Sequence, residues 1–221
     1  MKNINLLGIK LQDRYVRESV GLTEKFLREG AVHTILYLTP TVLLETAKDE
    51  KEKEWVEAAE LTVWGDTDIL DAAGITVKSR YHEVQENVFL KIFLRKMARI
   101  HKSILVLSDT EENAEILKQE LIEIQNNITV AGTMAIPDPY QAQEDLINKI
   151  NMITPDVIMA RMSFSLQREW LEQCRQYLNT GIWIGFPEHL SCIPKKEKPI
   201  KKIGNKLLNV LFSRQVSKYK E

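Results

Sequence analysis

The stretch PDVIMARMSFSLQREW, from Pro155 to Trp170, decides the fold. It opens with a short apolar run, DVIMA, of the length of one buried strand, and continues beyond a polar turn with the 3.6-residue periodicity of an amphipathic helix. We expect that helix to begin near Ser163. Its buried stripe is expected to consist of Leu166, Trp170, Leu171, Cys174 and Leu178. A buried strand followed directly by such a helix is the repeating unit of a parallel α/β sheet.

Similar units recur on both sides of this stretch. The apolar runs are INLLGI, TILYL, LTVW, ITV, SILVLS, ITVAG, DVIMA and GIWIGF, and segments of helical periodicity separate them. The helix before SILVLS has an apolar stripe of Val88, Phe89, Ile92, Phe93, Met97 and Ile100. Asp109, with Glu112 three residues on, and Asp138, before Pro139, mark two helix starts. The pattern predicts a Rossmann-like α/β fold, with a mainly parallel sheet flanked by helices.

The bulk composition fits one globular body in a reducing compartment. The chain has 221 residues, 44% of them hydrophobic, and a formal net charge of -1, so its overall charge gives no reason to expect nucleic acid as a partner. Its two cysteines, Cys174 and Cys192, have neither disulfide nor zinc spacing. The N-terminal apolar run is too short for a signal peptide, and no run of eighteen apolar residues occurs. We expect a cytoplasmic protein.

The C-terminal segment differs in charge from the rest of the chain. Residues 195–221 contain nine Lys or Arg and two Glu, a net charge of 9-2=+7, which leaves 21-29=-8 for residues 1–194. We therefore expect an α/β domain over residues 1–194 and a basic amphipathic helix within 195–221. Such a helix suits an anionic membrane surface. The residues expected to bind it are Lys201, Lys202, Lys206, Phe212 and Arg214. The alternative is that the helix packs on the domain or on a partner chain.

Candidate site residues follow the predicted strands, because ligands of open parallel sheets bind beyond the carboxyl ends of the strands. These residues are Thr39, Thr41, Gly65, Asp66, Asp68, Ser108, Asp109, Gly132, Thr133, Arg161, Ser163, Ser165, Glu188 and His189. The backbone N–H groups of Gly132 and Thr133 are candidates for binding a phosphate. The pair Asp66 and Asp68 could hold a divalent cation, but an Asp-x-Asp pair more often forms a turn or a helix cap. We expect no resident metal and no cofactor.

The order of several segments resembles the WecB/TagA/CpsF glycosyltransferase family, also called glycosyltransferase family 26. The segments are LLGIKL, TPTVLLETAKDE, WVEAAELTVWGD, VAGT and INKINMITPDVIMARMSFSLQREW, and the match as a whole covers nearly the whole chain. The resemblance implies transfer of an N-acetylhexosamine of the N-acetylmannosamine type from a UDP-sugar to a polyprenyl-diphosphate-linked acceptor. It also implies a place at the inner face of the cell membrane and a role in cell-surface polysaccharide synthesis.

The resemblance also suggests roles for particular residues. It implies an Asp-Gly turn that supplies the catalytic base, and here Asp66 stands one position late, with Gly65 in the place of the Asp. Gln167 matches a residue that contacts the sugar or the diphosphate, and Arg80 matches an Arg of the site. Thr39, Thr41 and Arg161 are expected near the diphosphate.

The later turn departs from the family pattern. Arg161 and Ser163 replace glycines, Ser165 replaces a proline and Arg168 replaces a glutamate. Two hypotheses follow: an active membrane-associated transferase, or a catalytically degenerate homologue that serves as a binding or partner subunit of a glycosyltransferase. A protein partner or a homo-oligomer is consistent with either.

Overall fold

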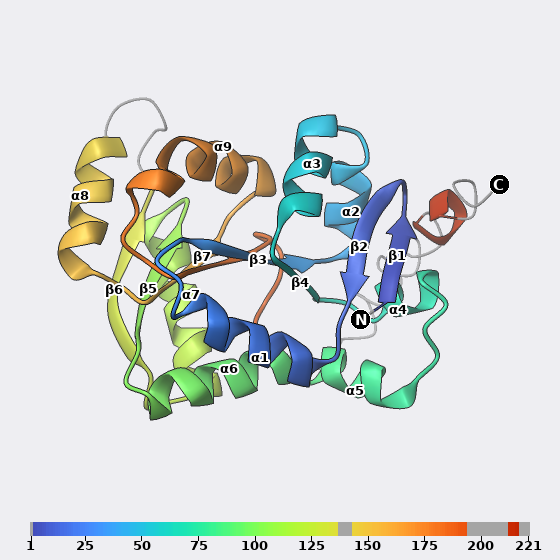
Figure 1. Cartoon of the computed structure of the whole chain (residues 1–221), viewed down its shortest axis with the longest axis horizontal. Helices are drawn as coiled ribbons and strands as arrows, with labels where there is room; N and C mark the ends of the chain where they lie inside the picture. Colours follow the sequence, from blue (N-terminus) through green and yellow to red (C-terminus); the bar gives the residue numbers. More distant parts are fainter. Residues whose placement is uncertain (1, 137–142, 194–211, 217–221) are drawn as a thin grey trace.

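A six-stranded parallel sheet forms the centre of the molecule, as the sequence predicts. The computed structural model describes residues 2–136, 143–193 and 212–216 (Figure 1). The strands are β4 (Leu61–Trp64), β3 (His33–Leu38), β8 (Ile182–Phe186), β7 (Val157–Arg161), β5 (Ser103–Ser108) and β6 (Thr129–Ala135), in this spatial order. All neighbouring pairs in this sheet are parallel. The strands β8, β7 and β5 are buried and almost wholly apolar, as expected for a sheet covered on both faces.

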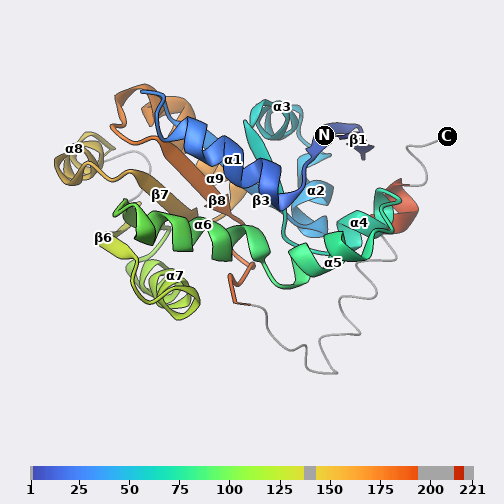
Figure 2. The same cartoon turned by 60° about the horizontal axis from the view of Figure 1, so that its bottom comes forward.

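Helices cover both faces of the sheet. One face carries α1 (Val16–Phe26), α6 (Val88–Arg99) and α7 (Glu111–Ile124), which lie side by side in Figure 2. The other face carries α8 (Gln143–Ile153) and α9 (Phe164–Cys174), which is followed by the 3-10 helix η1 (Arg175–Tyr177), together with α2 (Pro40–Thr46) and α3 (Glu50–Ala58). Two short helices, α4 (Asp68–Ala72) and α5 (Lys78–Gln85), connect β4 to α6.

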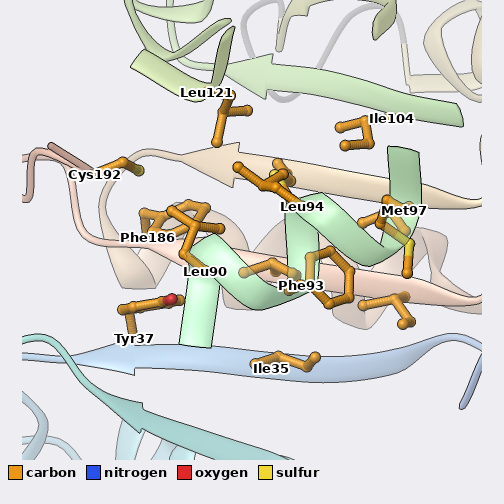
Figure 3. Close-up of a cluster of buried hydrophobic side chains, with 14 of the residues drawn as sticks. Ile35, Tyr37, Leu90, Phe93, Leu94, Met97, Ile104, Leu121, Phe186 and Cys192 are labelled. Carbon is orange, nitrogen blue, oxygen red and sulfur yellow. The ribbon is translucent and has the colours of Figure 1, made fainter. Parts of the chain in front are cut away.

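The core under α6 shows which part of the predicted apolar stripe is buried. Leu90, Phe93, Leu94 and Met97 pack on the strands beneath the helix (Figure 3). Ile92 and Ile100, which the sequence placed in the same stripe, are 39% exposed. That part of the prediction is wrong, because Ile92 lies on the side of the helix away from the sheet, and Ile100 follows the last residue of the helix.

The pair Pro155-Asp156 in the opening stretch ties two strands together. The Asp156 carboxylate accepts hydrogen bonds from the backbone N–H of Ser103, at 2.8 Å, and from Lys102 Nζ, at 2.7 Å. Burial opposes the charge on Asp156, but these hydrogen bonds outweigh it and lower the pKa of the carboxyl. The start of β7 is therefore fixed to the start of β5.

Three local predictions are wrong. The run INLLGI is a hairpin of β1 (Lys2–Leu6) and antiparallel β2 (Ile9–Asp13), because Leu7 and Gly8 adopt φ of 55° and 79° in the connecting turn. The run ITV forms no strand, and Ile75 is buried beside the hairpin and β4. The cap of α7 is Thr110, whose Oγ1 accepts from Asn113 N at 3.1 Å, in place of Asp109. The Asp138 prediction lies outside the described residues.

The helix after β7 begins where the sequence predicts. Ser163 caps α9 through Leu166 N, and Trp170, Leu171 and Cys174 are buried, with Trp170 stacked on Trp183. Arg168 donates from Nε to Glu52 Oε1 at 2.8 Å, which joins α9 to α3. This hydrogen bond, helped by Glu172, raises the pKa of Arg168 despite its burial. Arg168, which stands where the family pattern has a glutamate, thus helps to hold α9 against α3.

The described part of the C-terminal segment is a short helix over residues 212–216. Phe212 is 0% exposed and Val216 is buried, both in the cluster that includes β1, β2 and α4, whereas Arg214 is exposed. Among the described residues, no helix is both long and apolar enough to cross a membrane.

The tight packing of β8 under α9 gives a stability prediction. A Cβ on Gly185 would collide with the side chains of Gln167 and Leu36. A Cβ on Gly21, which is exposed on the outer side of α1, would meet nothing within 4 Å. Gly185→Ala should lower the free energy of unfolding in urea by about 1–3 kcal/mol. Gly21→Ala should raise it by up to about 1 kcal/mol, because alanine favours the helix. Equal effects of the two substitutions would contradict the packing described for β8.

Candidate functional site at the carboxyl edge of the sheet

Three loops meet at the carboxyl ends of β3, β4 and β8. Thr39 follows β3, and its Oγ1 lies 3.0 Å from Nε2 of His189, in the loop after β8. Gly65 follows β4, and its N–H donates to Leu38 O at 2.8 Å. A Cβ on Gly65 would lie 3.3 Å from the Thr39 side chain and 3.1 Å from that of Leu190. The loops are therefore in contact, and Asp66 directly follows Gly65 in the loop after β4.

Asp66 keeps its carboxylate at this edge. Its Oδ1 accepts from Asp68 N at 2.9 Å, which forms the turn before α4 and agrees with the turn reading of the Asp-x-Asp pair. The residue is half-buried, so part of the carboxylate can still reach a ligand. Within the described residues, no group of three or more His, Cys, Asp or Glu could hold a metal ion.

Thr39 and Thr41 belong to the start of α2. Thr39 is 4% exposed and caps the helix, since its Oγ1 accepts from Val42 N at 3.3 Å. Thr41 is half-buried in the first turn. His189 is exposed. The sequence placed it among the polar residues that follow strands but did not select it. His189 reaches Thr39 because β8 lies next to β3 in the sheet. This strand order cannot be read from one sequence, so the sequence provides no reason to select His189.

A second polar group lies at the ends of β5 and β7. The chain leaves these neighbouring strands in opposite directions, toward β6 and toward β8, which makes this a topological switch point. Ser108 donates from Oγ to Arg161 O at 2.6 Å, and the same Oγ is 3.0 Å from Asp109 Oδ1. Partial burial disfavours the Asp109 carboxylate, but hydrogen bonds from Asn113, Ser108 and the backbone prevail and lower the pKa of the carboxyl.

The guanidinium group of Arg161 is engaged within the protein. The residue is 7% exposed, and Nη1 donates to Glu120 Oε2 of α7 at 2.8 Å. Glu120 also accepts from Ser191 Oγ and from Cys192 N, each at 2.9 Å. Burial, and secondly the charge of Glu120, raise the pKa of the Cys192 thiol. Arg161 thus joins the end of β7 to α7, and Glu120 holds the loop after β8 at the same place.

The amide of Gln167 is also engaged. The residue is 0% exposed, and Nε2 donates to Met162 O at 2.9 Å and to Phe186 O at 3.0 Å, so both of its N–H groups are used. Its Oε1 accepts from Trp183 Nε1 at 3.2 Å. Gln167 therefore joins the ends of β7 and β8 beneath α9.

Arg80 lies near the end of β4, but its guanidinium group is paired within the protein. It is 3% exposed in α5, pairs with Asp13 Oδ1 at 2.5 Å and with Glu83, and has the ring of Tyr15 within 5.0 Å. Asp13 also accepts from Trp64 Nε1 at 2.8 Å. Arg80 consequently holds α5 to the hairpin and to β4.

The remaining predicted site residues fall elsewhere. Gly132 and Thr133 lie inside β6, paired with Leu105 and Val106, so the prediction that they follow the strand is wrong. The apolar run ITVAG ends before the strand does, because β6 continues through the less apolar residues TMA. Lys201, Lys202 and Lys206 lie outside the described residues.

An open parallel sheet with converging polar loops at its carboxyl edge defines a Rossmann-like α/β protein of the ligand-binding kind. A family model described as the glycosyl transferase WecG/TagA/CpsF family matches residues 4–197, and the chain belongs to this family. The match confirms the resemblance noted in the sequence and makes the protein glycosyltransferase-like. A comparison with curated proteins finds no match.

The Gln167 contacts give a prediction that separates a structural amide from a ligand-binding one. Gln167→Ala should lower the free energy of unfolding by about 2–4 kcal/mol, because Met162 O and the indole N–H of Trp183 lose their Gln167 partner in the core, and Phe186 O keeps only the N–H of Met162. Gln173→Ala, on the exposed side of the same helix, is the matched control and should change it by less than about 0.5 kcal/mol. Chemical denaturation of both variants gives the comparison. A Gln167→Ala variant of full stability would contradict the structural role.

Proposed function

We propose that the protein transfers an N-acetylhexosamine, of the N-acetylmannosamine type, from a UDP-sugar to a polyprenyl-diphosphate-linked acceptor in cell-surface polysaccharide synthesis. Membership of the glycosyltransferase family supports the reaction class. The observation that carries the proposal is the contact between three loops, which hold Thr39, Gly65 with Asp66, and His189, at the carboxyl ends of three adjacent strands. This is the edge at which such sheets bind nucleotide ligands.

The proposed chemistry needs one proton acceptor and one set of hydrogen-bond donors. The acceptor hydroxyl attacks the anomeric carbon of the donor sugar, the bond from that carbon to the diphosphate oxygen breaks, and UDP leaves. Asp66 would take the hydroxyl proton, since its carboxylate is half-buried and keeps one oxygen beyond the turn contact. The hydroxyl groups of Thr39 and Thr41 and the imidazole of His189 would donate to the leaving diphosphate.

The acceptor class suggests where the protein works. A polyprenyl chain stays in the bilayer, so the body must approach the inner face of the cell membrane. The basic residues of 195–221, with Lys201, Lys202 and Lys206 among them, would bind anionic headgroups there. Arg214 is exposed and would join them, whereas Phe212 is buried in the body and would have to leave its cluster to enter a bilayer.

A UDP-release assay tests the proposed reaction. The full-length protein, given UDP-N-acetylhexosamines and a short lipid-diphosphate acceptor, should release UDP. Asp66→Asn should slow the release by about 100-fold or more, because the variant lacks the proton acceptor. Asp145→Asn, exposed on α8, should not change the rate. A rate unaffected by Asp66→Asn would remove this residue from the mechanism, and the absence of release with every donor would remove the proposed reaction.

A second candidate function is a catalytically degenerate homologue that serves as a binding or partner subunit of a glycosyltransferase. The observation that favours it is that Arg161, Gln167 and Arg80 are all buried in contacts within the protein. Three side chains expected to hold the donor are then not free to do so.

Calorimetry with UDP separates the two candidates. A degenerate subunit should show no heat of UDP binding and should co-purify with a partner transferase from its own cells. Saturable UDP binding that His189→Ala weakens would instead support the transferase.

A further inference from the structure

The outer face of α6 carries apolar and cationic side chains together. Ile92, Arg95 and Arg99 are exposed and follow one another at helical spacing, so they form one stripe on the side away from the core. Ile100, at the end of the helix, is 39% exposed beside them. Residues 88–99 contain four Lys or Arg and no acidic residue.

The outer face of α7 has the same spacing with the opposite charge. Its exposed stripe consists of Glu112, Ile116, Gln119 and Glu123, and Ile116 is 46% exposed. Residues 111–124 contain five Glu and one Lys. The stripe borders a shallow hollow of about 450 Å³, which gives an incoming side chain a place to sit.

Contacts within the protein neutralise only part of these charges. Lys91 pairs with Glu86 and Lys96 with Glu24, whereas on α7 Lys118 pairs with Glu115 and Arg161 with Glu120. In the part of the chain that the structure describes, the side chains of the two stripes make no such pair. The residues concerned are Arg95 and Arg99 on α6 and Glu112 and Glu123 on α7.

The two helices are neighbours and run in the same direction. Both contribute to one core cluster, and Figure 2 places α6 between α1 and α7. Each helix leads from the carboxyl edge of the parallel sheet to its amino edge, because α6 precedes β5 and α7 follows it. A cationic stripe and an acidic stripe therefore lie alongside each other on one face of the molecule.

We propose that this face binds a second copy of the chain. A two-fold axis that runs along the groove between the helices places α6 of each copy on α7 of the other. Arg95 and Arg99 then meet the Glu112 and Glu123 stripe of the opposite copy, twice by symmetry. Ile92 and Ile116 are the exposed apolar side chains of the two stripes, and the contact buries them.

Charge decides between a second copy and other partners. An anionic membrane or a nucleic acid would be attracted by α6 but repelled by the Glu residues of the neighbouring helix α7. An acidic protein would leave the α7 stripe uncompensated. A second copy of the same chain offers an acidic stripe to α6 and a cationic stripe to α7, so it pairs the charges of both stripes at once.

A charge-swap experiment tests the proposal on the full-length protein. In light scattering after size-exclusion chromatography at low salt, the wild type should have about twice the chain mass of 25.6 kDa. The variant Arg95→Glu with Arg99→Glu, and the variant Glu112→Lys with Glu123→Lys, should each dissociate about 100-fold more readily, because every charge pair in the interface becomes repulsive. An equimolar mixture of the two variants should form the dimer again, since each α6 then meets an α7 of opposite charge.

The controls keep the outcome interpretable. Lys149→Glu, exposed on α8 across the sheet, should leave the dimer intact. All substituted residues are exposed, so circular dichroism should find each variant folded. A monomeric wild type, dimers that survive both reversals, or a mixture that stays monomeric would each overturn the proposal, which does not depend on the transferase reaction.

Discussion

The hydrogen bonds of the Gln167 amide are the interaction on which the carboxyl edge depends. One side chain satisfies Met162 O at the end of β7, Phe186 O at the end of β8 and the indole N–H of Trp183. Gly185 allows this approach because it lacks a Cβ. The two strands therefore end together beneath α9, and the loop after β8 turns toward β3.

The turn after β7, which resembles the family pattern in part, has a structural role in this arrangement. Arg161 replaces a glycine of the family pattern and reaches Glu120, which in turn holds Ser191 and Cys192. The loop after β8 is thus fixed from two sides, by Gln167 at its start and by Glu120 at its end. His189 lies between these fixed points and is presented to Thr39. The turn after β7 thus supports the candidate site, and the candidate ligand-binding groups follow β3, β4 and β8.

Much of the fold could be predicted because buried strands and helices have characteristic spacings of apolar residues in the sequence. The apolar strand Val157–Arg161 and the stripe of Trp170, Leu171 and Cys174 were read from periodicity alone. The hairpin was missed because INLLGI is apolar throughout, and the reversal at Leu7 and Gly8 is a matter of backbone conformation. Strand order was also out of reach, since it depends on contacts between distant segments.

The site was harder to predict for the same reason. Thr39 and Asp66 are predicted as site residues because they come just after apolar runs, and the structure places both at the carboxyl edge. Arg80, Arg161 and Gln167 have the residue types of ligand-binding groups, but their partners Asp13, Glu120 and Phe186 are distant in sequence. No local sequence pattern distinguishes an Arg that binds a phosphate ligand from one that pairs with a carboxylate of the same protein.

The most direct measurement is a titration of the isotopically labelled protein with UDP, followed by two-dimensional NMR. The account predicts that the backbone signals of Thr39, Gly65 and Asp66 shift, while the side-chain amide of Gln167 and the indole N–H of Trp183 stay in place. Shifts concentrated at Gln167 and Trp183, with Gly65 and Asp66 unmoved, would contradict it.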